Sequence, residues 1–150
     1  MGNKLSDYEV VDVTCEPSLW MYGDPVRQEL GVDFKSAVGR GVFGLRDFKG
    51  DYCAFMCYAR TKNVPSSVSD LKEMTTVAGN IIVPYTVWSL QKGAGRQIIN
   101  GVISLIKESG FANRVVTLSP LTEMARNFHL RNGAFEFRKN KDTVNFEYLI

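Results

Sequence analysis

A glycine-containing turn separates a strongly apolar stretch of the chain from an amphipathic one. It consists of Gln91, Lys92, Gly93, Ala94, Gly95 and Arg96. The two glycines allow the backbone to turn sharply and to pass close to a ligand. If a helix begins here, its first amides have no partner within the helix, and its dipole favours an anion at that point. The turn therefore predicts a phosphate or pyrophosphate site, to which Lys92 and Arg96 would add positive charge. Glycines that serve only tight packing are the alternative interpretation.

The two commonest nucleotide-binding loops do not fit this turn. A dinucleotide-binding Gly-x-Gly-x-x-Gly pattern would need a glycine where Ile98 stands. A Walker loop would need Gly-Lys-Ser or Gly-Lys-Thr, and the chain contains neither. If the turn binds phosphate, it does so as a loop of another kind, and a strand-to-helix turn with glycines for tight packing remains the alternative.

Metal chemistry is disfavoured by the supply of ligands. The chain has three cysteines and one histidine, His129, and their positions do not follow the spacing of zinc ligands. An odd number of cysteines also argues against a disulfide framework. We therefore expect no metal site and reduced cysteines, with Cys53 and Cys57 packed in the core as small apolar side chains.

Hydrophobic periodicity and turn residues predict the elements that would position the glycine turn. Strands are expected at residues 8–14, 39–48, 52–59, 80–90, 114–118, 134–137 and 143–149, the second and third forming a hairpin. Helices are expected at residues 19–30 (interrupted), 34–38, 93–108 and 119–133, with at best a helical turn at 69–74. Pro84 requires an edge position, a bulge or a late start for its strand. Ser119 and Pro120 would start the last helix. This order predicts a mixed sheet with helices on both faces.

Length and composition limit the classes of protein. With 150 residues, 45% hydrophobic and 23% charged, the chain is expected to form one domain, residues 1–150. No apolar run approaches the ~20 residues that span a bilayer, so no membrane association is expected. Without a recognisable signal peptide, the expected location is cytoplasmic. Gly2 with Ser6 fits a loose N-myristoylation pattern, for which an ordinary polar terminus is the alternative.

The charge balance gives no reason to expect a large basic surface for nucleic acid. The formal net charge is +2, from 18 basic and 16 acidic residues. Arg27, Arg40 and Arg46 are expected to be solvated charges. If they clustered, they would suit an anionic substrate.

The stretch from Val83 to Gly133 resembles the core of the GNAT N-acetyltransferase superfamily. In that family a strand leads into a loop of the form Gln/Arg-x-x-Gly-x-Gly/Ala, and the following helix holds the pyrophosphate of coenzyme A. Gly93 and Gly95 match the glycines, whereas Leu90 stands where Gln or Arg is usual. The resemblance implies an α/β (α+β) fold with a mixed, mostly antiparallel sheet of about six to seven strands and helices on both faces.

A second stretch resembles the same family independently. The family reads roughly Asn-x-x-Ala-x-x-x-Tyr-x-x-x-Gly-Phe on the helix after the next strand. Here Ala125 and Gly133 match, while Thr122, His129 and Ala134 replace Asn, Tyr and Phe. The chain looks closest to small, divergent, phage-type members of the superfamily.

The resemblance implies that an acyl group, most simply acetyl from acetyl-CoA, passes to an amine that attacks the thioester directly. A backbone amide of the stretch Val87, Trp88 and Ser89 would bind the thioester oxygen. His129 holds the position of the tyrosine that commonly protonates the leaving thiolate, and imidazole chemistry suits that role. A hydrogen-bonded histidine of the core is the alternative.

The resemblance also leaves one role open and adds two contacts. Residues 80–90 lack the acid that often serves as general base, which leaves Tyr85, Thr86 and Ser89 as polar side chains there, besides water or an acid from the early helices. Thr122 and Ala125 would join the glycine turn and the preceding strand in binding the coenzyme.

Two other classes of function remain open from the sequence. One is a nucleic-acid base modifier on the same fold, such as the phage Mom-type proteins, although the near-neutral charge argues mildly against it. The other is a module that binds coenzyme A without catalysis. The amine acceptor could be a small molecule, a protein or a nucleobase, and an oligomer is possible.

Overall fold

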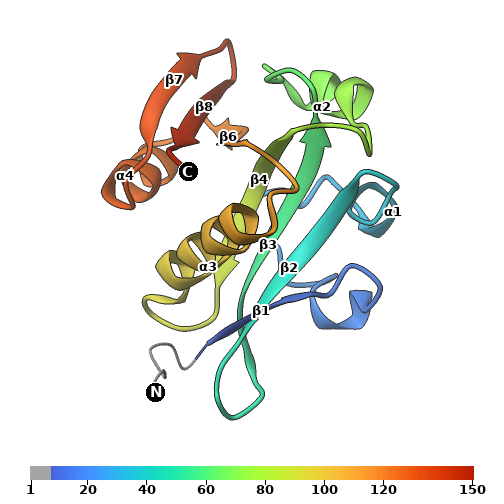
Figure 1. Cartoon of the computed structure of the whole chain (residues 1–150), viewed down its shortest axis with the longest axis vertical. Coiled ribbons are helices and arrows are strands. Elements are labelled where there is room, and N and C mark those ends of the chain that lie inside the picture. The colour runs from blue at the N-terminus through green and yellow to red at the C-terminus, as the bar shows by residue number, and fades with distance from the viewer. Residues whose placement is uncertain (1–7) are drawn as a thin grey trace.

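The candidate residues lie on one mixed sheet and on or just before two of the helices beside it. The computed structural model describes residues 8–150, and its eight strands follow the order β1-β2-β3-β4-β5-β8-β6, with β7 also paired to β8 (Figure 1). The strands are β1 (Glu9–Asp12), β2 (Arg40–Arg46), β3 (Tyr52–Thr61), β4 (Ile81–Ser89), β5 (Arg114–Val116), β6 (Ser119–Pro120), β7 (Phe135–Lys139) and β8 (Thr143–Tyr148). The mostly antiparallel sheet is confirmed, with β6 as the strand that the prediction lacks. Gly2 and its lipidation pattern lie outside the described residues.

Four α-helices and one 3₁₀ turn accompany the sheet. They are α1 (Val32–Lys35), α2 (Val68–Met74), α3 (Ala94–Ser109), α4 (Glu123–Arg131) and the 3₁₀ turn Pro17–Leu19. The long helix α3 ends at Gly110 in the left-handed conformation, as its sequence predicts. Among residues 8–150, no helix has both the length and the apolar character needed to span a bilayer.

Alternation along the strands produces a separate core on each face of the sheet. In β2, Val42 points into a core that contains Trp20 and Leu71, whereas Phe43 points into the core beneath α3. The apolar stripe of α3, which includes Ile98, fills that second core. Helices and irregular segments therefore cover both faces, as predicted.

Pro84 lies in the middle of a central strand, where a bulge accommodates it. Cys57 of β3 pairs with Thr86, and the next residue, Tyr58, pairs with Pro84, so Tyr85 is an extra residue in β4. Of the three positions open to this proline, the bulge is the one that the structure uses. The bulge turns β4 where its pairing with β5 ends.

The sheet separates between β4 and β5. These two strands are parallel, and only Ile81 and Ile82 of β4 have partners, Arg114 and Val115. The amide of Leu118 then donates to the carbonyl of Pro84 at 2.9 Å, and no pairing between the two strands is recorded after that point. The part of the chain that follows β5 thus leaves β4 at the bulge.

The chain from β5 onward forms a second half of the molecule, made of β5, β6, α4, β7 and β8 (Figure 1). A loop of the first half also holds this half in place. Asn145 donates to the carbonyl of Pro65 at 2.9 Å, and the hydroxyl of Thr143 donates to the carbonyl of Ser66 at 2.7 Å.

One predicted helix is wrong, and so is the predicted start of another. The 19–30 segment is irregular after its 3₁₀ turn, because Gly23 and Pro25 disfavour a helix and the Asp24 carboxylate accepts the nearby amides of Val26 and Arg27. The last helix does not start at Ser119 and Pro120, which form β6 and pair with β8. Instead, the hydroxyl of Thr122 accepts the amide of Ala125 at 3.2 Å and caps α4.

The 69–74 segment is more ordered than predicted. It belongs to α2, whose first turn is capped by the hydroxyl of Ser67, which accepts the amide of Asp70 at 3.0 Å. The predicted hairpin of β2 and β3 is confirmed. Cys53 and Cys57 are buried, as expected, whereas Cys15 is exposed.

Candidate active site

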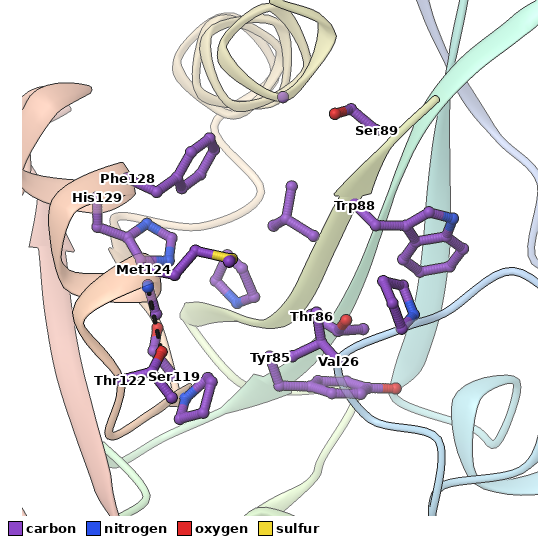
Figure 2. A pocket seen from close by; sticks show the side chains of 16 residues that line it. Val26, Tyr85, Thr86, Trp88, Ser89, Ser119, Thr122, Met124, Phe128 and His129 are labelled. Atoms are coloured by element: carbon purple, nitrogen blue, oxygen red, sulfur yellow. Dashed lines mark hydrogen bonds between the residues drawn. The ribbon is translucent and has the colours of Figure 1, made fainter. Parts of the chain in front are cut away.

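A cleft of about 530 Å³ opens where β4 and β5 separate. Residues 84–89 of β4 form one wall. The opposite wall comes from α4 and its cap and consists of Thr122, Met124, Ala125, Phe128 and His129 (Figure 2). Gly95, near the start of α3, lies at one end, and the loop residues Pro25 and Val26 contribute at β4. The lining contains no lysine, arginine, aspartate or glutamate, so the cleft suits an uncharged, elongated group.

The glycine turn lies at the start of α3, as predicted. Gly93 is the N-cap and has φ of 84°, a conformation that favours glycine, and a Cβ there would meet nothing within 4 Å. The amide of Ala94 donates to the carbonyl of Gln91. Lys92 and Arg96 are exposed, and within residues 8–150 neither forms an ion pair. The turn thus offers a cationic helix start beside the cleft.

Gly95 has a packing role as well. A Cβ at this residue would lie 3.0 Å from Cε1 of Phe128, so the phenyl ring of α4 rests against the start of α3. The interpretation that glycine serves close packing therefore holds for Gly95, whereas Gly93 has open space around it. The contact also fixes the distance between the two helices that border the cleft.

The backbone of β4 turns two amides toward the cleft. In an antiparallel ladder, hydrogen-bonded pairs alternate with pairs that are not bonded. The amide of Leu90 donates to the carbonyl of Cys53 on β3 at 2.8 Å. By alternation, the amide of Trp88 also faces β3, and the amides of Val87 and Ser89 face away from it. Those two amides lie where β5 no longer provides a partner.

The other β4 candidates lie at different depths. The ring centres of Trp88 and Phe55 lie 5.3 Å apart, and Trp88 also lines the cleft. Ser89 is exposed, and its hydroxyl extends toward the start of α3 (Figure 2). Tyr85 contributes its ring to the wall, but its hydroxyl points away from His129 and is buried without a partner in the described part of the chain. Burial raises the pKa of Tyr85 far above its ordinary value.

His129 lies in the α4 wall and is buried. Its Nδ1 is 2.6 Å from the hydroxyl of Tyr148, and its ring stacks on Phe146 with 5.3 Å between the ring centres. Burial lowers the pKa of His129 to about 4, so the ring is neutral at pH 7. The geometry therefore agrees with the interpretation as a hydrogen-bonded core histidine, and the residue also lines the cleft. A neutral ring with this pKa does not hold the proton that the predicted donation to the thiolate would need. Thr122 and Ala125 line the same wall.

Arg27, expected to be solvated, is 8% exposed and joins the separating strands. Its Nε donates to the carbonyl of Tyr85 at 3.2 Å, and its Nη2 donates to the carbonyl of Leu118 at 3.0 Å. The planar guanidinium thus satisfies backbone carbonyls on both sides of the gap, where no sheet partner exists. Sequence gives little sign of this role, because the partners are 58 and 91 residues away.

An ion pair fixes the loop that carries Arg27. The carboxylate of Asp24 lies 2.7 Å from Nζ of Lys35, both side chains being buried, and it accepts the hydroxyl of Thr86 from β4 at 2.9 Å. Burial alone would raise the pKa of Asp24, but the bonds from Lys35 and from backbone amides hold it below its usual range. Asp24 directly precedes the cleft residues Pro25 and Val26, and its carboxylate charge is already paired with Lys35.

The other two arginines, Arg40 and Arg46, differ from Arg27 in their surroundings. Arg40 is partly buried, lies 4.1 Å over the ring of Phe34 and donates to the hydroxyl of Thr75, so its predicted solvation is also wrong. Arg46 pairs with Glu9 at the exposed edge of the sheet. The three arginines do not form one patch. Within residues 8–150 no group of three or more potential metal ligands exists either.

No protein-family model matches the chain, and no curated protein matches its sequence. Solved structures do share its fold. Malonyl-CoA decarboxylase from Agrobacterium vitis has a TM-score of 0.62 at 19% identity, over 81% of this chain and 35% of the decarboxylase. The N-acetyltransferase PseH from Campylobacter jejuni has a TM-score of 0.62 at 11% identity, over 95% of this chain and 98% of PseH. The GNAT-like decarboxylase GphF, in complex with isobutyryl-CoA, has a TM-score of 0.71 at 11% identity, over 94% and 98%.

These likenesses define the class of architecture. The fold of this chain is shared by solved structures named as an N-acetyltransferase, as a malonyl-CoA decarboxylase and as a GNAT-like decarboxylase. It is the GNAT fold, and the chain has that fold. The chain spans about a third of the length of the Agrobacterium decarboxylase and about three fifths of the corresponding protein from Cupriavidus metallidurans.

Proposed function

We propose that the chain is an acyl-CoA-dependent N-acyltransferase that binds its thioester substrate in the cleft between β4 and α4. One observation carries the proposal: the strands separate opposite a cationic helix start, and unpaired amides of β4 line the gap between them. A thioester on a long pantetheine arm has a matching form, with an anionic pyrophosphate at one end and an amide-containing, uncharged chain at the other.

Each part of the substrate has a chemically suitable partner. The amides of Gly95 and Arg96 and the charges of Lys92 and Arg96 would hold the pyrophosphate. The pantetheine arm would run along Val87 and Ser89, whose amides can pair with its own amides. Thr122 and Ala125 would form the opposite wall. The open space at Gly93 leaves room for phosphate oxygens close to the backbone.

The reaction would need little more than these groups. A neutral amine attacks the thioester carbon, the carbonyl oxygen gains negative charge, and an amide of β4 stabilises that charge. The C–N bond then forms completely, the C–S bond breaks, and the proton lost by the amine passes to the departing thiolate. The cleft lining holds no carboxylate, so water is the simplest carrier of that proton. His129, which is neutral at pH 7, can offer a hydrogen bond to the thioester or its sulfur.

Binding calorimetry with acetyl-CoA tests the proposal. Reversing both charges in Lys92→Glu/Arg96→Glu should weaken binding tenfold or more, because two carboxylates would face the pyrophosphate. The matched control is Lys107→Glu, an exposed change near the other end of the same helix, which should leave affinity unchanged. No binding by the folded wild type, or equal losses in both variants, would overturn the site.

Turnover then needs a separate assay. Release of the coenzyme A thiol should depend on an added amine, and a mixed panel of aromatic, aliphatic and polyamine acceptors would show which class supports it. Binding with no turnover on any acceptor would instead support the non-catalytic binding module.

Decarboxylation of a malonyl-type thioester is the second candidate. It is favoured by the absence of a carboxylate base from the lining and by the decarboxylases among the structural neighbours. In this reaction a C–C bond breaks, carbon dioxide leaves, and the electron pair forms an enolate whose oxygen the same β4 amides can stabilise. Protonation of the carbon completes the step. Malonyl-CoA converted to acetyl-CoA without amine, with the thioester intact, would identify this reaction by mass.

A further inference from the structure

The hydroxyl of Tyr148 lies beside His129, the histidine that lines the cleft, where it can determine which ring nitrogen carries the hydrogen. Tyr148 is on β8 and is 3% exposed, and its hydroxyl is 2.6 Å from Nδ1 of His129 on α4. No other hydrogen-bond partner of this hydroxyl occurs within the described chain. Since buried polar groups rarely remain unpaired, the O–H hydrogen must be directed at the one acceptor within reach.

That requirement assigns the hydrogen on the imidazole ring. If Tyr148 donates to Nδ1, then Nδ1 is the acceptor nitrogen and Nε2 carries the hydrogen of the neutral ring. The opposite tautomer would put a hydrogen on Nδ1 and leave the hydroxyl hydrogen of Tyr148 buried without an acceptor. Burial raises the pKa of Tyr148 well above its ordinary value, so the hydroxyl keeps its proton.

The surroundings of the ring contain nothing that would reverse this assignment. Phe146 of β8 stacks on the imidazole, and Phe128 of α4 meets it edge-on at 5.1 Å. From the cleft side, the lining residues are uncharged. Tyr148 is thus the titratable group that faces His129, and burial alone lowers the pKa of the imidazole.

We propose that Tyr148 is a positioning residue that holds His129 in the Nε2–H tautomer and so makes the ring a neutral hydrogen-bond donor in the acyl-CoA cleft. This inference rests on the proposed function for the role of the donor, but not for the tautomer itself. A neutral N–H keeps its proton, so it stabilises charge on the thioester oxygen or sulfur without becoming an imidazolate. The proton that the thiolate needs still comes from the attacking amine.

Nuclear magnetic resonance of ¹⁵N-labelled protein tests the tautomer without substrate. His129 is the only histidine of the chain, so its two ring nitrogens give an unobstructed signal. Couplings between the ring nitrogens and the carbon-bound ring protons should show Nε2 protonated and Nδ1 unprotonated at pH 7. A predominant Nδ1–H tautomer, or a charged ring, would overturn the proposal whether or not the protein binds acyl-CoA.

The variant Tyr148→Phe removes the hydroxyl and keeps the ring. We expect a mixture of the two tautomers and a turnover lowered about tenfold, with KM and acyl-CoA affinity changed less than twofold. The matched control is Tyr58→Phe, which removes the hydroxyl of a half-buried tyrosine that packs against the α3 core and does not line the cleft. Unchanged tautomer and turnover in a folded Tyr148→Phe would contradict the inference. Failure of wild-type acyl-CoA binding would count against the proposed function alone.

Discussion

At the scale of single residues, the environment of His129 governs how the protein responds to pH. Its ordinary pKa of about 6.5 falls to about 4 in the folded chain, because burial disfavours the charged ring. The unfolded chain therefore binds a proton that the folded chain rejects between these two values. The contribution of His129 to the free energy of unfolding is fully present above about pH 6.5 and is lost as the pH falls toward 4.

We therefore predict that acid weakens the fold partly through one side chain. Between pH 7 and pH 4, the free energy of unfolding should fall by about 3 kcal/mol through His129. In His129→Phe, which can still stack on Phe146, that part of the loss should disappear. Urea titrations of both proteins at several pH values measure the difference. Parallel curves for the two proteins would show that the imidazole is already charged or accessible in the fold.

At the scale of elements, Arg27 connects the two strands whose separation forms the cleft. Its guanidinium pairs with one carbonyl on β4 and with another just after β5. Without the side chain, both buried carbonyls lose a partner, and the width of the gap has one constraint fewer. The residue thus contributes both to stability and to the shape of the site.

We predict that Arg27→Met lowers the free energy of unfolding by about 2–4 kcal/mol, as two buried carbonyls become unsatisfied. Acyl-CoA affinity should fall as well, because the strands no longer keep their spacing. Arg27→Lys keeps the charge but cannot reach both carbonyls, and we expect it to recover only part of the loss. Arg46→Met, at the exposed edge, is the control and should behave as the wild type. Thermal unfolding and calorimetry check both effects, and equal results at Arg27 and Arg46 would contradict them.

The elements that sequence predicts well are those with strong local signals. The stripe of α3 and the alternation around a tight turn in β2 and β3 are readable because each depends on neighbours within a few residues. The 19–30 segment could not be predicted in this way. Its apolar residues indicate a helix, whereas the buried Asp24 carboxylate accepts backbone amides two and three residues later and stabilises turns. Thr122 rather than Ser119 caps α4 because Ser119 is already paired with β8.

The candidate site also contains residues that short motifs predict and residues that only the folded structure reveals. The glycine turn and the wall residues Thr122 and Ala125 follow from short motifs, and Gly95, Thr122 and Ala125 line one cleft in the structure. Arg27 and Tyr148 could not be found in this way, because their partners are distant in sequence and become neighbours only when the sheet forms. Their residue types, a basic side chain and an aromatic one, give no signal of a role without that geometry.

At the scale of the whole molecule, the cleft lies between two halves that are each continuous in sequence. Residues 8–109 supply β1 to β4 and α3, and residues 110–150 supply β5 to β8 and α4. The two halves meet through a short parallel pairing, through Arg27 and through the loop that contacts β8. A ligand in the cleft would touch both of them.

We predict that acyl-CoA restrains the two halves together. Hydrogen exchange should slow in β4 of the first half and in α4 of the second when acetyl-CoA is added. At a hundredfold excess over its Kd, the ligand should raise the free energy of unfolding by about 2.7 kcal/mol. Mass spectrometry of peptides from both halves measures the protection, with α2, outside the cleft, as internal reference. Protection limited to one half would mean that the ligand does not lie between them.

The position of β8 among its neighbours also bears on synthesis. This strand pairs with β5, β6 and β7, all of which precede it in the chain. A nascent chain that has emerged only as far as α4 already contains the glycine turn, yet β5 and β6 still lack their partner and His129 lacks Tyr148. The cleft, one wall of which contains His129, would therefore be completed only after β8 has emerged from the ribosome.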